Sequence, residues 1–264
     1  MSDHSVSAPN LAELHTHRSE KWRGFPADVL PLPVAEMDYP VAQPIRDLLF
    51  EMVAKSDLGY LGSIPELGQG FAYFAGTRWN WEVDPLQVRA ATDVGVAVVD
   101  ILRVFTQPGD SILLSSPVYH NFYNWINETK LNLVDVPFER TGDESSNPWE
   151  MNWDGIEKAY ASGLKVHILC SPHNPLGRIY SKEELLRLVA LAKRYEVLII
   201  SDVIHAPLTY KDKSFTPMLS LGKEAEEVSI TVTAASKGWN IAGLKCAIIV
   251  TQNEALKSKL DSMP

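Results

Sequence analysis

From residue 86 onward, short apolar runs alternate with longer amphipathic segments. Seven runs of five or six residues are rich in Val, Ile and Leu, and polar, Gly or Pro residues bound them, which is typical of buried strands. They span residues 86–91, 111–115, 131–136, 165–170, 197–201, 228–232 and 246–250. Apolar residues at helical spacing predict helices at 94–106, 119–128, 153–161 and 181–195. This alternation predicts an α/β fold with a mainly parallel seven-stranded sheet, covered by helices on both faces.

Two local patterns refine this prediction. Ser181 is followed three residues later by Glu184, which is the signature of a capping box at a helix start. Only thirteen residues separate Val232 from Cys246, so the last strand could run antiparallel to its neighbour.

The N-terminal part has a different pattern. Residues 1 to about 45 are interrupted by Pro26, Pro31, Pro33, Pro40 and Pro44, which predicts irregular structure there because proline breaks both helix and ladder hydrogen bonding. Residues 45–55 and 66–79 carry apolar side chains at helical spacing and predict two helices, with a turn at Gly59–Gly62 between them.

Composition narrows the class of protein. The chain has 264 residues, a net charge of −9 and 45% hydrophobic residues, which is an ordinary globular composition. Its acidic balance argues against a nucleic-acid partner, and no apolar run is long enough to span a membrane. The N-terminus is polar and lacks the apolar region of a signal peptide, so we expect a cytoplasmic protein.

Cysteines and histidines add little chemistry of their own. Cys170 and Cys246 both lie in apolar runs, so we expect buried free thiols, although the sequence leaves a disulfide open. His15 and His17 form an isolated pair, and a metal site needs more ligands nearby, so we expect no metal.

Lys237 lies in the segment between the last two predicted strands, next to Ser236 and Gly238. A lysine in a turn is usually a solvated surface residue. The other interpretation is an amine held in a pocket to form a Schiff base with a carbonyl cofactor, because burial readily lowers the pKa of a lysine.

Other candidate residues follow the predicted strands, where open α/β sheets bind their ligands. Thr92–Val96 opens a helix, whose backbone N–H groups suit a phosphate. Tyr119 offers either an aromatic face or a packed ring. Two prolines and a glycine fix a turn that directs Asn174 toward the strand ends. Asp202 is either a partly buried carboxylate that needs a partner or an ordinary capping residue, and His205 alone reads as a core histidine.

In this order, these features resemble the pyridoxal-phosphate enzymes of the aspartate-aminotransferase fold. Ser171–Gly177 and Ser236–Leu244 are similar to two motifs of that superfamily, the second of which carries the cofactor lysine. Val34–Pro40 and Ile200–His205 resemble segments of the MalY/PatB-like cystathionine β-lyases, with Val203 where those enzymes have Glu. Residues 58–60 and 116–119 resemble segments of the same β-lyases as well.

The resemblance implies a cofactor, pyridoxal 5′-phosphate, and a role for each matching residue. Lys237 would bind the cofactor covalently and act as the catalytic base. Asp202 would keep the ring nitrogen protonated, and Tyr119 would stack on the ring. Asn174 would bind the 3′ oxygen, and His205 stands where many relatives have a Tyr for that oxygen.

The resemblance also implies how the phosphate is held. The backbone N–H groups of Val94, Gly95 and Val96, the Ser236 hydroxyl and the Lys245 ammonium group would bind it. Tyr60 would reach the phosphate of a neighbouring subunit, which implies a homodimer.

Two departures from the family pattern are visible. Ala234 occupies a position where aminotransferases often have a phosphate-binding Ser. The chain ends at Pro264, whereas relatives continue for on the order of a hundred residues that include an Arg for the substrate carboxylate. We therefore expect residues 1–45 to belong to a small domain at the site's rim and residues 46–264 to form the cofactor-binding large domain. The C-terminal part of the small domain would be absent, in a fragment or in a truncated form with impaired catalysis.

The expected activity is that of a C–S β-lyase, which cleaves cystathionine or cysteine S-conjugates to a thiol, pyruvate and ammonia. An aminotransferase is the alternative, since it shares every step up to Cα deprotonation. A third possibility is a non-catalytic protein that binds the cofactor or a partner. Only the segments at 34–40 and 200–205 favour the lyase.

Overall fold

The computed structural model describes residues 7–141 and 148–263. The chain forms two compact units. The smaller consists of Met1–Gly62 and Ala235–Leu244, and the larger of Ser63–Ala234 and Lys245–Pro264. The domain boundary expected between residues 45 and 46 stays a prediction.

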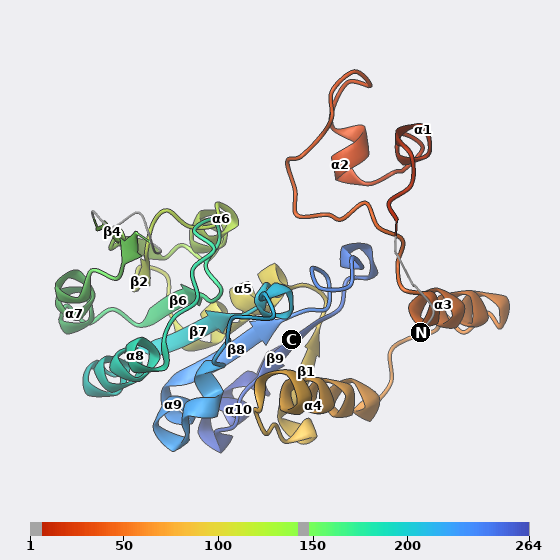
Figure 1. The fold of residues 1–264 in the computed structure, drawn as a ribbon. Helices are drawn as coiled ribbons and strands as arrows, with labels where there is room; N and C mark the ends of the chain where they lie inside the picture. Colours follow the sequence, from red (N-terminus) through yellow and green to blue (C-terminus); the bar gives the residue numbers. More distant parts are fainter. Residues whose placement is uncertain (1–6, 142–147, 264) are drawn as a thin grey trace. The chain divides into compact units, whose positions relative to one another are not determined.

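A seven-stranded sheet is the centre of the larger unit, with the strand order β1-β9-β8-β7-β6-β2-β3 (Figure 1). Strands β2, β3, β6, β7 and β8 pair in parallel, whereas β9 runs antiparallel to both β8 and β1. This confirms the mainly parallel sheet and the antiparallel last strand. The strands are β1 (Val88–Ala91), β2 (Ser111–Leu114), β3 (Asn132–Asp135), β6 (Val166–Cys170), β7 (Leu198–Asp202), β8 (Ser229–Thr233) and β9 (Ala247–Val250).

Helices cover both faces of this sheet because its strands are apolar on both sides. Ile200 and Ile249 face one apolar cluster, to which α5 (Val94–Phe105), α6 (Asn121–Glu128) and α10 (Glu254–Leu260) contribute. Ile199 faces the opposite cluster, to which α7 (Trp153–Ala161), α8 (Lys182–Tyr195) and α9 (Lys223–Val228) contribute. Helix α4 (Pro65–Trp79) packs on Ile248 through Ala75.

Smaller elements complete the larger unit. They are the 3₁₀ helices η1 (Pro85–Gln87), η2 (Ala206–Leu208) and η3 (Met218–Leu221), and the antiparallel pair β4 (Glu139–Arg140) and β5 (Trp149–Glu150).

Most sequence-based predictions are confirmed. Each of the seven predicted strands lies within two residues of an observed one, and Ser181 and Glu184 form the predicted capping box, with bonds of 3.2 and 2.9 Å. Helix α6 begins two residues later than predicted, so Tyr119 precedes it. The prediction that Cys246 is buried is wrong. Its side chain is exposed because β9 begins one residue later, whereas Cys170 is buried, and both thiols are free.

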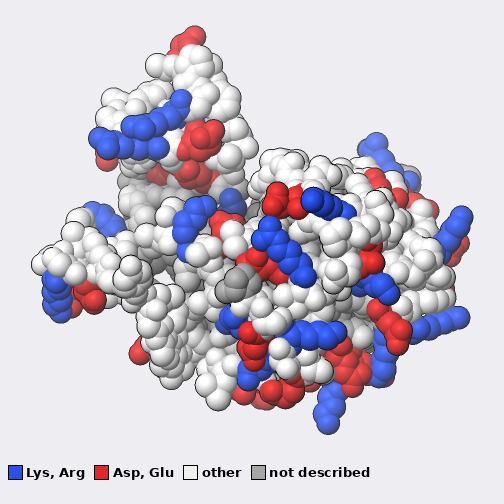
Figure 2. Space-filling model, turned by 180° about the vertical axis from the view of Figure 1, so that it is seen from behind, with Lys and Arg blue, Asp and Glu red and all other residues white. Residues whose placement is uncertain are grey.

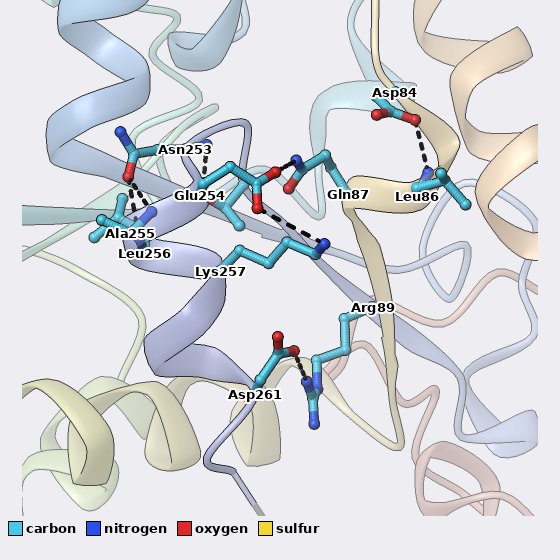
Figure 3. Close-up of polar contacts among 11 residues, drawn as sticks. Asp84, Leu86, Gln87, Arg89, Asn253, Glu254, Ala255, Leu256, Lys257 and Asp261 are labelled. Atoms are coloured by element: carbon cyan, nitrogen blue, oxygen red, sulfur yellow. Dashed lines mark hydrogen bonds and ion pairs between the residues drawn. The ribbon is translucent and has the colours of Figure 1, made fainter.

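Helix α10 was not predicted, and it lies against the edge strand β1 (Figure 3). Asn253 caps the helix, since its side-chain oxygen accepts the N–H groups of the second and third following residues at 3.0 Å. Gln87 donates to Glu254 at 2.6 Å, and Arg89 pairs with Asp261 at 3.0 Å. Exposed ion pairs stabilise little, so the cap and the buried Leu260 are the stronger anchors of this helix.

In the smaller unit, the expectation of irregular structure over residues 1–45 is wrong in part. Short helices occur at α1 (Leu11–Leu14) and α2 (Glu20–Arg23), and α3 spans Gln43–Ala54. The Lys21 ammonium group is buried and lies 2.7 Å from the Asp38 carboxylate, which also accepts the Trp22 indole N–H at 2.9 Å. Burial alone would raise the pKa of Asp38, but these two hydrogen bonds outweigh burial and lower it.

Charges of both signs are mixed on the surface. On the face shown in Figure 2, Lys and Arg side chains are interspersed with Asp and Glu. Lys193, for example, lies 2.8 Å from Glu224 and 3.3 Å from Glu227. In the described part of the chain, no helix combines the length and the apolar composition that a membrane crossing requires.

A buried histidine on β6 makes stability depend on pH. His167 Nδ1 lies 2.8 Å from the Tyr160 hydroxyl, and both side chains are buried. Burial, with a smaller contribution from His173, lowers the pKa of His167 from 6.5 to about 3. Between these two values the unfolded chain binds more protons than the folded one, so the folded state loses stability as the pH falls below 6.5.

We predict a fall in the free energy of unfolding of roughly 1.4 kcal/mol for each pH unit below 6.5, and no contribution from His167 above that pH. Urea unfolding between pH 4.5 and 7.5 measures it. The double variant Tyr160→Phe/His167→Leu removes the titrating group without leaving an unpaired hydroxyl, and its acid slope should be shallower. Equal slopes in both proteins would contradict this assignment.

Candidate active site

The candidate site lies at one edge of the sheet, the edge formed by the carboxyl ends of five strands rather than by an outermost strand. Strands β1, β2, β6, β7 and β8 point the same way, so their carboxyl ends share this edge. All of the predicted site residues in the larger unit follow or end one of these strands, except Lys245, which precedes the antiparallel β9. The backbone topology therefore brings together segments that are up to about 150 residues apart in the sequence.

Asp202 is the last residue of β7 and only 5% exposed. Its side chain accepts the backbone N–H of Ile204 at 3.1 Å, which shapes the turn toward His205. In the parallel pairing of β6 with β7, Cys170 is its direct neighbour. The burial predicted for this carboxylate is confirmed, and burial is costly for a carboxylate unless hydrogen bonds or a positive charge compensate.

The loop after β6 folds back over Cys170. The Cys170 thiol accepts the backbone N–H of Asn174 at 3.3 Å and lies 3.5 Å from the carbonyl of Pro172. Burial raises the pKa of this thiol far above its usual value, and the charge of Asp202 adds to the shift, so the thiol stays protonated. The half-buried Asn174 is thereby fixed beside the end of β7.

His173 joins this loop to the loop after β2. Its Nε2 lies 2.9 Å from the carbonyl of Pro117, and its Nδ1 lies 3.1 Å from the Tyr180 hydroxyl. A carbonyl only accepts, so Nε2 carries the proton and Nδ1 accepts from Tyr180. Burial lowers the pKa of His173, which favours this neutral form. The imidazole thus ties the segment of Asn174 to the segment that leads into Tyr119.

The first turn of α5 is the predicted phosphate site. The N-cap residue Asp93 accepts the Gly95 N–H at 2.9 Å, and Lys245, which has a left-handed φ of 53°, lies 3.0 Å from the other oxygen of that carboxylate. Val94 is buried and Val96 is exposed. Asp93 takes the Gly95 N–H, but the other first-turn N–H groups lack partners within the helix and Lys245 offsets the charge of Asp93, so this turn suits an anion.

Trp125 links that turn to Tyr119. A Cβ built on Gly95 would lie 2.8 Å from the Trp125 ring, so this position requires a glycine. The Trp125 ring in turn lies 6.3 Å from the half-buried Tyr119 ring, in an edge-on arrangement. Tyr119 also accepts a hydrogen bond from Asn121 at 2.5 Å. The predicted stacking residue and the predicted phosphate turn are therefore neighbours.

The smaller unit contains Tyr60, Ser236 and Lys237. The Lys237 amine donates to the carbonyl of Ala35 at 3.2 Å, Ser236 is half-buried, and Tyr60 is fully exposed. Lys237 is three residues from Asn240, whose side chain binds the backbone of Met37. The segment 34–40 therefore contacts the lysine loop, which sequence reasoning did not predict.

Four residues that contact the candidate groups within one unit or the other were missed from the sequence: Cys170, His173, Trp125 and Asn240. His173 and Asn240 lie inside the two quoted motifs, so their position was a usable signal. Cys170 and Trp125 look like ordinary core residues in the sequence, and only the register of β6 and the approach of α6 to α5 reveal their contacts.

A separate cleft of the larger unit lies elsewhere. A cleft of about 640 Å³ is lined by residues 76–80 at the end of α4 and by eight residues between 206 and 215. None of the predicted site residues lines it. We place the candidate site at the sheet edge, because the convergent polar groups and the buried carboxylate are there rather than in this cleft.

No group of three or more His, Cys, Asp or Glu side chains suited to a metal occurs among residues 7–141 and 148–263. His15 instead packs edge-on against Trp22 at 5.2 Å.

Comparison with known proteins identifies the family. Residues 34–264 match the profile of "Aminotransferase class I and II". The chain belongs to this family. The resemblance to MalY/PatB-like cystathionine β-lyases is confirmed as well, since similar class I and II members include a cystathionine beta-lyase of Corynebacterium glutamicum, 35% identical over 94% of this chain and 64% of that protein. Cystathionine beta-lyase PatB of Bacillus subtilis is 29% identical over 89% of this chain and 60% of that protein.

Solved structures agree with the fold. A PLP-bound C-S lyase of Staphylococcus hominis matches 89% of this chain and 58% of its own, with a TM-score of 0.81 and 25% identity. The aspartate-aminotransferase-like fold predicted from the sequence is thus confirmed. The chain spans 60 to 64% of the length of the first curated relatives that it matches.

The residues at the sheet edge fit pyridoxal 5′-phosphate chemically. A buried carboxylate suits a protonated ring nitrogen, and a helix start beside a lysine suits a phosphate. The Trp125 ring packs directly against Gly95, in the turn predicted to bind the phosphate.

Gly95→Ala should therefore destabilise the protein by about 1–3 kcal/mol, because the added methyl group overlaps the Trp125 ring. Gly70→Ala is a matched control within helix α4, where nothing lies within 4 Å of the new Cβ, and it should leave stability unchanged or raise it by up to ~1 kcal/mol. Denaturant unfolding measures both. In a Trp125→Leu background the cost at Gly95 should shrink, and an undiminished cost there would show that the indole is not its cause.

Proposed function

We propose that this chain is the cofactor-binding part of a pyridoxal-phosphate-dependent C–S β-lyase that acts on cystathionine or cysteine S-conjugates. The observation that carries the proposal is the buried Asp202 carboxylate at the end of β7, beside Cys170 and the loop of Asn174. Membership of the class I and II family and the cystathionine β-lyases among the relatives support it.

In this proposal each group at the sheet edge binds one part of the cofactor. Asp202 holds the proton on the ring nitrogen, which lets the bound ring accept electrons from the substrate's Cα. Asn174 donates to the 3′ oxygen. His205, which is half-buried and three residues after Asp202, stands where many relatives have a Tyr for that oxygen. Tyr119 covers one face of the ring. Lys245 assists the first turn of α5 in binding the phosphate.

In this proposal the phosphate is also bound by the backbone N–H groups of Val94, Gly95 and Val96 and by the Ser236 hydroxyl. The Asp93 side chain caps this turn by accepting the Gly95 N–H. The Lys245 ammonium lies beside the same carboxylate and offsets its negative charge. We expect Asp93 and Lys245 to act together in shaping the anion site.

Lys237 supplies the amine that binds the cofactor's aldehyde. Once free of the cofactor, the Lys237 amine would take the Cα proton of the substrate as general base. The Cβ–S bond would then break with its electron pair on sulfur, and the thiolate would take up a proton to leave as the thiol product. Hydrolysis of the remaining three-carbon fragment yields pyruvate and ammonia.

A homodimer belongs to the same proposal. Helix α3 has no buried residue, and its Leu48, Phe50 and Val53 side chains are more than half exposed. Exposed apolar side chains on one helix are typical of a surface that another chain covers. Tyr60, also exposed, would then reach the phosphate bound to the second copy. A cytoplasmic location belongs to the same proposal.

We predict that borohydride reduction of the protein mixed with pyridoxal 5′-phosphate labels Lys237, because only a covalently bound amine is trapped. Peptide mapping by mass spectrometry locates the label. Lys237→Arg keeps the charge but lacks the reactive amine, and it should show no label at this peptide. Labelling of Lys245 instead, in folded protein, would overturn the assignment.

We further predict that cystathionine yields pyruvate and a free thiol without any keto-acid acceptor. Lactate dehydrogenase coupling measures pyruvate, and a thiol reagent measures the second product. An aminotransferase would instead require 2-oxoglutarate and release no thiol. A strict requirement for the keto acid would replace the lyase with the transaminase, whereas cofactor binding without either product would favour the non-catalytic alternative.

A further inference from the structure

The side chain of Asn240 holds the backbone of residues 37–39. Its amide nitrogen donates to the carbonyls of Met37 at 2.8 Å and Tyr39 at 3.1 Å, and its oxygen accepts the Met37 N–H at 3.1 Å. Because carbonyls only accept, this set fixes which end of the amide is the nitrogen. Both N–H donors of the side chain are used, so the amide has one possible orientation.

The bound segment has no regular structure of its own. Residues 35–38 lie outside any helix or strand, and one backbone bond, from the Glu36 N–H to the carbonyl of Val34, is internal to the stretch. Side chains hold it from two directions instead. Lys21 donates to the carbonyl of Glu36 at 3.2 Å and pairs with Asp38, while Asn240 binds the residues on either side of Asp38.

The same segment meets the candidate catalytic amine. The Lys237 amine donates to the carbonyl of Ala35 at 3.2 Å, two residues before Met37. The two segments therefore touch at two neighbouring places. Lys237 contacts Ala35, and Asn240, three residues later, contacts Met37, which is two residues after Ala35. Asn240 therefore holds this segment two residues beyond the carbonyl that the amine contacts.

Asn240 also meets a backbone requirement. Its φ is 56°, in the left-handed region that Asn, Asp and Gly tolerate far better than other residues. Of these three, only Asn supplies two donors and an acceptor together. The position therefore combines a conformational and a hydrogen-bonding demand.

We propose that Asn240 is a positioning residue for Lys237, acting through the 35–39 segment. It fixes the carbonyl of Ala35, which takes one hydrogen of the amine and so sets the direction of the nitrogen lone pair. This role rests on the proposed function, in which that lone pair first binds the cofactor's aldehyde and later takes a proton. A nucleophile or base held in one orientation reacts faster than one that rotates freely.

The test uses Asn240→Gly and Asn240→Asp, both of which tolerate the left-handed φ. Gly removes all three hydrogen bonds. Asp keeps the acceptor for the Met37 N–H but loses both donors and sets a carboxylate against two carbonyls. Asn80→Gly is the matched control, because Asn80 has a φ of 50° at the end of α4, in the larger unit.

The first measurement uses cofactor-free protein. An amine-selective acylating reagent is applied across a range of pH, and mass spectrometry follows the modification rate of Lys237. Both Asn240 variants should change this rate at least threefold or shift its pH midpoint, with thermal unfolding close to that of the parent. Asn80→Gly should leave the Lys237 profile unchanged. Parent-like profiles in Asn240→Gly would overturn the proposal, and a parent-like Asn240→Asp would contradict the part assigned to the donor bonds.

The second measurement uses protein loaded with pyridoxal 5′-phosphate. A loss in kcat of about tenfold in Asn240→Gly, with KM changed less than threefold, is expected if the residue positions the amine rather than binds substrate. An unchanged kcat would overturn the role in turnover. If borohydride fails to label Lys237 in the parent, the proposed function fails, and the acylation experiment still decides whether Asn240 holds the segment.

Discussion

The parallel pairing of β6 with β7 is the interaction on which the candidate site depends. It places Cys170 beside Asp202, so that a neutral thiol and a buried carboxylate end two neighbouring strands. The thiol then accepts the Asn174 N–H, which turns the following loop back over the sheet edge. A shift of one residue in this register would turn the side chains of one strand to the opposite face of the sheet and separate Cys170 from Asp202.

A second layer of side chains keeps the loops of this edge in place. His173 reaches from one loop to the carbonyl of Pro117 in the next, and Trp125 fills the space against Gly95 where any other side chain would clash. Neither His173 nor Trp125 is among the cofactor-binding residues that the family resemblance names. Each nevertheless restrains a candidate cofactor group, so the precision of the site comes from buried neighbours as much as from the residues that would touch the ligand.

The sequence predicted the sheet well because each strand is a short apolar run with clear boundaries, and a run such as Leu198–Ile200 fits no other element of this length. It missed α10, which has only seven residues, three of them charged, and owes its place to Leu260 and to contacts with the edge strand. It also misjudged Cys246, since an apolar run does not reveal at which residue a strand begins. The candidate residues were found through motifs, whereas the contacts of Trp125 and Asn240 arise from tertiary packing that no local pattern encodes.

In the proposed function, Asp202 keeps the cofactor's ring nitrogen protonated. Nitrogen NMR of protein loaded with pyridoxal 5′-phosphate that is ¹⁵N-labelled in the ring tests it most directly. The parent should show the chemical shift of a protonated ring nitrogen at neutral pH, and Asp202→Asn, which keeps the shape of the side chain but not its charge, should show the unprotonated shift. A ring nitrogen that is unprotonated in the parent, or equally protonated in both proteins, would contradict the account.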